Sequence, residues 1–141
     1  MKPKIIVTRD IPDEVESKLK QYFRVSLNRE DKVFSNDILR KAMENADGIV
    51  CTVTDNITDK LLTLPNKKVK IIADIGVGVD HIDLQSAKQN NVIITNTPDV
   101  LTEATVDIAT LLLLSVTRNA FLMETMSVSY THLTLPTTIE V

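Results

Sequence analysis

The fold class follows from one stretch of the sequence, VKIIADIGVGVDHIDLQSAKQNNVIIT, at residues 69–95. It opens with the β-branched run Val69–Ala73, which is typical of a buried strand. A loop with two glycines follows, and Asp83 can then cap a helix over Leu84–Asn90. The stretch ends with a second β-branched run, Val92–Thr95. Strand, helix and strand in this order are typical of a parallel sheet with crossover helices.

The same alternation of strand and helix signals precedes this stretch. Three further strands are expected over Lys4–Thr8, Arg24–Leu27 and Ile49–Thr52. Three further helices are expected: one opened by Pro12 with the apolar stripe Val15, Leu19 and Phe23, one capped by Ser35, and one from Thr58 to Leu64. This order predicts an α/β fold of the flavodoxin-like type, a parallel five-stranded sheet with helices on both faces.

A longer helix is expected from Thr102 to Asn119. Glu103 and Asp107 in its early turns and Arg118 at its end complement the helix dipole. Most of its central positions are apolar, including four consecutive leucines, so one face against a single sheet cannot bury them all. Three interpretations stay open: a fully buried core helix, simple excess hydrophobicity, and packing against a second domain or subunit.

The composition of the 141 residues excludes several classes of protein. Only three glycines are present, and a dinucleotide fingerprint that starts at Gly76 would place its third glycine on His81. A net charge of −3 with scattered basic residues argues against a nucleic-acid partner. The longest apolar run, around Leu111–Leu114, is far shorter than the ~20 residues of a membrane helix. A lone cysteine, Cys51, fits a reducing, cytoplasmic location.

In an open parallel sheet, ligands bind beyond the carboxyl ends of the strands. The most informative loop at that edge is Ile75–Asp80, IGVGVD, because it has two glycines directly after a strand. One interpretation is an anion-binding turn, in which the backbone amides of Val77 and Gly78 hold a carboxylate or a phosphate. The other is a tight turn in which a glycine adopts a positive φ. The spacing alone does not decide between them.

Other polar candidates at this edge are weaker. Arg9 can neutralise an anion, although an ion pair with Asp10 or Asp13 is the more common role of such an arginine. His81 can titrate near neutral pH or serve as a hydrogen-bonded loop residue. Cys51 ends an apolar strand, which favours a buried small side chain over a nucleophile. With two histidines in the chain, the spacing indicates no clustered metal site, and we expect no bound metal.

Three stretches of the chain resemble one protein family. They are MKPKIIVTRDIPDEV at residues 1–15, KIIADIGVGVDHIDLQSAKQNNVIITNTPDV at residues 70–100, and LTEATVDIATLLLLSVTRN at residues 101–119. In this order they resemble the first part of the D-isomer-specific 2-hydroxyacid dehydrogenases, and most closely the glyoxylate reductases. The resemblance implies a substrate-binding lobe over residues 1–101, an interdomain helix over residues 102–119, and a cofactor-binding domain that this sequence does not contain.

The resemblance also assigns roles to individual residues. It implies that the backbone amides of Val77 and Gly78 hold the substrate carboxylate, in agreement with the anion-binding interpretation of their loop. Val53 and Thr54 match the loop that borders the substrate on its other side. Thr105 matches a position near the nicotinamide end of the cofactor, which is NAD or NADP in this family.

The activity that the resemblance implies is the reduction of a small 2-oxo acid, such as glyoxylate or hydroxypyruvate, to the 2-hydroxy acid. In the family an arginine binds the substrate, and a histidine paired with a glutamate donates the proton. None of these three residues has a match here, so we expect an N-terminal fragment that is inactive alone. The intact protein is expected to be a homodimer, and this chain is expected to self-associate through Ile108 and Leu111–Leu114.

Residues 120–141 depart from the family pattern. From Ser127 onward, SVSYTHLTLPTTIEV resembles translated vector sequence and shows no helix periodicity. A short strand around Tyr130 is the most that its composition favours. We expect this tail, with His132, to have no evolved role.

A different class of function is a free-standing flavodoxin-like signalling or interaction domain. A phosphoacceptor domain of that fold needs an acidic pair after the first strand, an aspartate that ends the third strand and a lysine after the fifth. Arg9-Asp10, Thr52–Asp55 and Thr97-Pro98 stand at those places. The acidic pair is therefore incomplete and the lysine is absent, which leaves Asp55 as the candidate phosphoacceptor.

Overall fold

The computed structural model describes the backbone of residues 1–130 and the side chains of residues 1–125. The chain divides into two compact units, Met1–Val100 and a second unit that begins at Leu101. The first unit contains the sheet with its crossover helices, and the described part of the second unit contains two helices.

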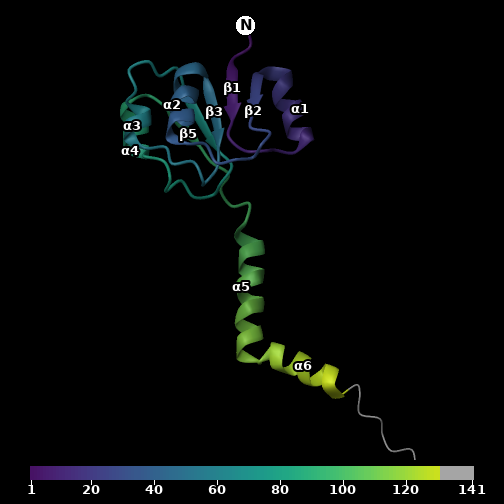
Figure 1. Cartoon of the computed structure of the whole chain (residues 1–141). Helices are drawn as coiled ribbons and strands as arrows, with labels where there is room; N and C mark the ends of the chain where they lie inside the picture. Colours follow the sequence, from purple (N-terminus) through teal and green to yellow (C-terminus); the bar gives the residue numbers. More distant parts are fainter. Residues whose placement is uncertain (131–141) are drawn as a thin grey trace, which may run out of the picture. The chain divides into compact units, whose positions relative to one another are not determined.

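The first unit is built on five parallel strands in the order β2-β1-β3-β4-β5 (Figure 1). The strands are β1 (Lys4–Val7), β2 (Arg24–Leu27), β3 (Gly48–Cys51), β4 (Ile71–Asp74) and β5 (Ile93–Thr95). This is the flavodoxin-like order, in which the direction of strand addition reverses once. The predicted fold class is confirmed.

Four helices connect these strands: α1 (Asp13–Tyr22), α2 (Asn36–Asn45), α3 (Asp59–Leu62) and α4 (Leu84–Gln89). The connection through α1 runs across the sheet in one direction, from β1 to β2, and the connections through α2, α3 and α4 run in the other. Because crossovers are right-handed, α1 lies on one face of the sheet and α2, α3 and α4 lie on the other (Figure 1). Ser35 caps α2 by accepting a hydrogen bond from the amide of Ile38 at 3.4 Å. Asp83 caps α4 by accepting one from the amide of Ser86 at 2.8 Å. Both caps are as predicted.

The core lies between the sheet and α2, α3 and α4. One row of isoleucines, aligned by the strand register, faces these helices: Ile6, Ile49, Ile72 and Ile94. Leu39 and Met43 of α2 are fully buried against this row. Within the first unit, the opposite face carries only α1, and Ile71 and Ile93 on this face are 40% and 61% exposed. The hydrophobic stabilisation of the first unit therefore comes mainly from one face of its sheet.

The apolar stripe predicted on α1 is only partly covered. Leu19 and Phe23 are half-buried, and Val15 is 45% exposed. Glu16 is instead buried, and the hydrogen bonds and charges of Lys20 and Arg29 hold its pKa below the ordinary range. The stripe stays partly open because α1 is the only helix of the first unit on its face of the sheet.

The second unit contains α5 (Thr102–Thr117) and α6 (Ala120–Tyr130). Thr102 begins α5 as predicted, but the helix ends before Asn119, which adopts a positive φ of 49°. The sequence predicts no helix from Ser127 onward and favours a strand around Tyr130. Both expectations are wrong as far as residue 130, because α6 continues to that point. The rest of the predicted tail lies outside the described residues.

The apolar residues of α5 are exposed. Within the part of the chain that the structure describes, no residue of this helix is buried. Leu111–Leu114 are between 55% and 64% exposed, and Ile108 is 57% exposed. Within the second unit, α6 therefore does not bury the apolar residues of α5, and the three interpretations of this helix stay open. Among residues 1–130, no helix is both long enough and apolar enough to cross a membrane.

We expect the chain to self-associate through this apolar surface of α5, because burying several leucines removes a large apolar area from water. Sedimentation velocity should show a concentration-dependent rise in mass. The double variant Leu111→Glu/Leu114→Glu should sediment as a monomer, because a carboxylate is costly to desolvate at an interface. Val33→Glu, at an exposed loop valine, is the matched control and should still associate. A wild-type chain that stays monomeric at high concentration would contradict this expectation.

Candidate functional site

Four loops meet at the carboxyl edge of the sheet, where the ends of parallel strands come together. They follow β1, β3, β4 and β5, and they contain Thr8 and Arg9, residues 52–56, residues 75–82, and Asn96 and Thr97. Hydrogen bonds link the loop after β1 to the loop after β3, and the loop after β5 to the loop after β4. The sequence predicts that ligand chemistry lies at this edge of the sheet.

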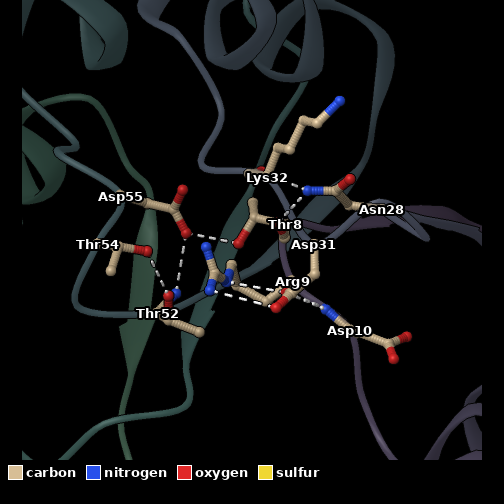
Figure 2. Close-up of polar contacts among 9 residues, drawn as sticks. All are labelled: Thr8, Arg9, Asp10, Asn28, Asp31, Lys32, Thr52, Thr54 and Asp55. Atoms are coloured by element: carbon tan, nitrogen blue, oxygen red, sulfur yellow. Dashed lines mark hydrogen bonds and ion pairs between the residues drawn. The ribbon is translucent and has the colours of Figure 1, made fainter.

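Asp55 fixes the loop after β3. Its side chain is 0% exposed, and its Oδ2 accepts hydrogen bonds from the Thr8 hydroxyl at 2.5 Å and from the Thr52 amide at 3.0 Å (Figure 2). The hydroxyls of Thr52 and Thr54 share a further hydrogen bond of 2.9 Å. These contacts tie the loop to the end of β1 and leave Val53, which is 62% exposed, at its tip.

The Gly76–Gly78 loop is held by its carbonyl oxygens. The amide and the hydroxyl of Thr97 donate hydrogen bonds to the Gly76 oxygen at 2.9 and 3.1 Å, and the Asn96 side-chain amide donates one to the Val77 oxygen at 2.8 Å. Within residues 1–130, the backbone amides of Val77 and Gly78 donate no hydrogen bond. The loop therefore keeps two successive donors for an anion.

The two glycines of this loop have different roles. Neither has a positive φ, so the interpretation as a tight turn that needs one is wrong. A Cβ at Gly76 would lie 2.7 Å from Asp74 Oδ2 and 3.2 Å from a methyl carbon of Val53, which leaves no room for a side chain. A Cβ at Gly78 would meet only Asp80 Oδ2, at 3.8 Å. Gly76 thus allows close packing between loops, and Gly78 borders open space.

The structure brings four of the five predicted site residues to this edge. Val53 packs against Gly76, and Thr54 lies on the same loop as Val53. Val77 is 41% exposed, and Gly78 borders open space. Thr105 lies on α5 in the second unit, and its role near a cofactor stays a prediction.

Arg9 is occupied by an ion pair. Its Nε lies 3.1 Å from Asp31 Oδ1, and the amide of Asp10 donates to the same oxygen at 2.9 Å (Figure 2). The expected pairing of Arg9 with Asp10 or Asp13 is therefore wrong. Asp31 becomes the partner because it lies in the loop after β2, the neighbour of β1, where its positive φ of 50° turns the chain back.

Cys51, Asp74 and His81 form a buried cluster beneath the glycine loop. Burial raises the pKa of the Cys51 thiol to about 12, with help from the charge of Asp74, so the thiol is protonated at neutral pH and is no nucleophile. Burial also raises the pKa of Asp74, while His81, with Nε2 3.4 Å from Asp74 Oδ1, acts in the opposite direction. Cys51 is 0% exposed, as the sequence indicates.

The spacing of these three residues along the chain does not reveal this cluster. The strand register pairs Cys51 with Asp74, because both end neighbouring parallel strands. The sequence predicts both strands, but the pairing of Cys51 with Asp74 follows only if the last residue of each strand is known. His132, the other histidine, lies outside the described residues.

The sequence matches the family model of the D-isomer specific 2-hydroxyacid dehydrogenase catalytic domain over residues 5–139. Glyoxylate reductase from Thermococcus litoralis is 39% identical over 118 residues, and the enzyme of the same name from Pyrococcus horikoshii is 38% identical over 119. Each match covers 84% of this chain and 35% of the relative. The chain thus spans about a third of the length of these curated relatives.

Solved structures show the same fold. A putative D-isomer specific 2-hydroxyacid dehydrogenase, described as NAD-binding, from Polaromonas sp. JS6 66 has a TM-score of 0.76 and 28% identity. That match covers 100% of this chain and 44% of the other. A protein from Thermus thermophilus has a TM-score of 0.72 and 34% identity, over 98% of this chain and 43% of the other.

The different packing of the two glycines predicts different costs of an added methyl group. We expect Gly76→Ala to lower the free energy of unfolding by about 1–3 kcal/mol, because the new Cβ collides with a buried carboxylate. Gly78→Ala should leave it unchanged or raise it by up to about 1 kcal/mol, because the backbone is compatible and the unfolded chain loses freedom. Urea denaturation measures the free energy of unfolding of both variants. Equal decreases in the two variants would contradict the different packing of Gly76 and Gly78.

Proposed function

This chain belongs to the D-isomer specific 2-hydroxyacid dehydrogenase family, and we propose that it is the substrate-binding part of an NAD- or NADP-dependent oxidoreductase. The substrate in this proposal is a small 2-oxo acid, such as glyoxylate or hydroxypyruvate, which is reduced to the 2-hydroxy acid. The names of the curated relatives support glyoxylate as the first substrate to test.

One observation carries the proposal: two neighbouring backbone amides, of Val77 and Gly78, donate no hydrogen bond within residues 1–130. A carboxylate accepts hydrogen bonds from two such donors at once, and its negative charge strengthens both. Because Gly78 has no side chain and faces open space, an anion can approach the backbone closely. In this proposal the backbone amides bind the carboxylate of the substrate, and other groups contact the rest of the substrate.

The loop after β3 supplies the second border of the proposed substrate site. Val53 contributes an exposed apolar surface, and the Thr54 hydroxyl is held by Thr52. Val53 lies close to Gly76, where a Cβ would come within 3.2 Å of its methyl carbon, so this loop stands next to the glycine loop that offers the free amides. The specificity for a short 2-oxo acid is therefore proposed to begin with Val53 and Thr54.

A nicotinamide cofactor is part of the proposal through the family and through the NAD-binding Polaromonas relative. The glycine loop of this chain does not fit the pyrophosphate of such a cofactor. The space beside Gly76 is filled by Asp74 and Val53, and the position of a third glycine holds His81. We assign to this chain only a contact from Thr105 near the nicotinamide, and we place hydride transfer and protonation with residues outside it.

A free-standing signalling domain of the same fold is less well supported. Its phosphoacceptor would be Asp55, which is 0% exposed and whose Oδ2 is occupied by Thr8 and Thr52. A phosphoryl donor would have to displace these contacts before it reached the carboxylate. The buried, hydrogen-bonded Asp55 instead has a structural role in shaping the substrate loop.

We expect 2-oxo acids to stabilise the chain by binding its folded state. Thermal unfolding followed by circular dichroism should show a rise in Tm that grows with the concentration of glyoxylate or hydroxypyruvate. Glycolaldehyde, which has no carboxylate, is the matched ligand control and should have no effect. Gly78→Val should lose the response, because the added side chain covers the two amides, while Val33→Ala should keep it.

The same purified chain should not oxidise NADH or NADPH in the presence of either 2-oxo acid. Glyoxylate reductase from Thermococcus litoralis, assayed in parallel, is the positive control. Turnover by the chain alone would contradict the proposal that catalysis lies outside it. An equal rise in Tm with glycolaldehyde, or an unchanged response in Gly78→Val, would contradict the carboxylate site.

A further inference from the structure

Three side chains with metal-binding atoms converge beneath the edge of the sheet. Cys51 ends β3, Asp74 ends β4, and His81 follows the glycine loop. Cys51 Sγ, a carboxylate oxygen of Asp74 and a ring nitrogen of His81 all lie within 4.8 Å of one another. We propose that these three residues bind Zn²⁺ or a divalent cation of similar softness.

The distances within the cluster suit a tetrahedral ion. His81 Nε2 lies 3.4 Å from Asp74 Oδ1, and Cys51 Sγ lies 3.9 Å from the same oxygen. Around a zinc ion with bonds of ~2.3 Å to sulfur and ~2.0 Å to nitrogen and oxygen, ligand atoms are separated by roughly 3.3–3.6 Å. The two distances to Asp74 are therefore close to the required spacing, and the third, between Cys51 and His81, is at most 4.8 Å.

The cluster is also short of hydrogen bonds. The Asp74 side chain is 0% exposed, and within the described residues its Oδ2 has no hydrogen-bond partner, while the only polar contact of His81 Nε2 is the 3.4 Å ion pair with Asp74 Oδ1. Buried polar atoms are normally paired, because an unpaired one loses its hydration without compensation. A cation bound by His81 Nε2 and the Asp74 carboxylate satisfies these groups.

The charges of the proposed site balance. A Cys51 thiolate and an Asp74 carboxylate carry two negative charges, which a divalent cation neutralises, so that the complex can stay buried. Binding transfers the thiol proton to solvent, because the thiolate is the ligand. Sulfur and imidazole ligands favour zinc or cobalt over magnesium, which prefers oxygen ligands in octahedral geometry.

One residue of the proposed site, His81, also lines a cavity of about 540 Å³. Three acidic residues, Asp59, Asp80 and Asp83, and one basic residue, Lys60, line the same cavity, whereas Cys51 and Asp74 do not. The ion is therefore proposed to enter from the His81 side, where acidic residues outnumber basic ones. The proposal does not depend on dehydrogenase activity, so the two can fail separately.

The test uses Co²⁺ as a spectroscopic probe for zinc, added to the tag-free 141-residue chain. We expect one equivalent to bind and to produce a thiolate-to-cobalt charge-transfer band that Zn²⁺ removes. Because Cys51 is the only cysteine, the band reports on this residue without any variant. Zn²⁺ should also raise the Tm of the wild-type chain, and Mg²⁺ should not.

Variants then separate the site from adventitious binding. Cys51→Ser should lose the charge-transfer band, and His81→Gln should weaken cobalt binding by roughly tenfold or more. His132→Gln is the matched control and should bind as the wild type does. No charge-transfer band in the wild-type chain, or a zinc response that persists in Cys51→Ser, would overturn the proposal. The wild-type measurements decide the question even if a variant fails to fold.

Discussion

Hydrogen bonds to two backbone carbonyl oxygens determine what this edge of the sheet can bind. Asn96 and Thr97, directly after β5, hold the oxygens of Val77 and Gly76, which fixes the orientation of the peptide groups between them. The amides of Val77 and Gly78 are thereby left for a ligand. The interaction joins segments about twenty residues apart, so it exists only when β4 and β5 pair in their observed register.

The sheet could be predicted from sequence because its signals are local. Runs of β-branched residues mark β1, β3, β4 and β5, and β2, which has only Val25 of this type, still has the predicted bounds, Arg24–Leu27. The run that begins at Val69 is longer than β4, because the amides of Val69 and Lys70 bond to Met43 and Asp47 before strand pairing begins. The apolar composition of the run indicates that it is buried, but it does not distinguish hydrogen bonds to loop residues from the pairing of strands. Helix α6 is not predicted because threonines dominate the tail that follows it, although Ala, Leu, Met and Glu precede them.

The candidate site could be predicted only in part. The glycine spacing singled out the loop over Ile75–Asp80, and two explanations fitted it; the backbone excludes the turn with a positive φ, and anion binding is our proposal. The buried Asp55, the partner of Arg9 and the cluster around Asp74 depend on which strand ends are neighbours, and this is a property of the register. Each of them joins segments at least 22 residues apart through a carboxylate. A pattern confined to one segment contains no trace of such contacts.

The central claim is that the backbone amides of Val77 and Gly78 bind a carboxylate. A titration of the ¹⁵N-labelled chain with glyoxylate, in a buffer with a chelator to exclude metal effects, tests it at the two groups themselves. We expect saturable downfield shifts of these two amide resonances, larger than those elsewhere in the chain, and the loss of these shifts in Gly78→Val. Shifts confined to basic side chains or to other loops, with Val77 and Gly78 unchanged, would contradict it.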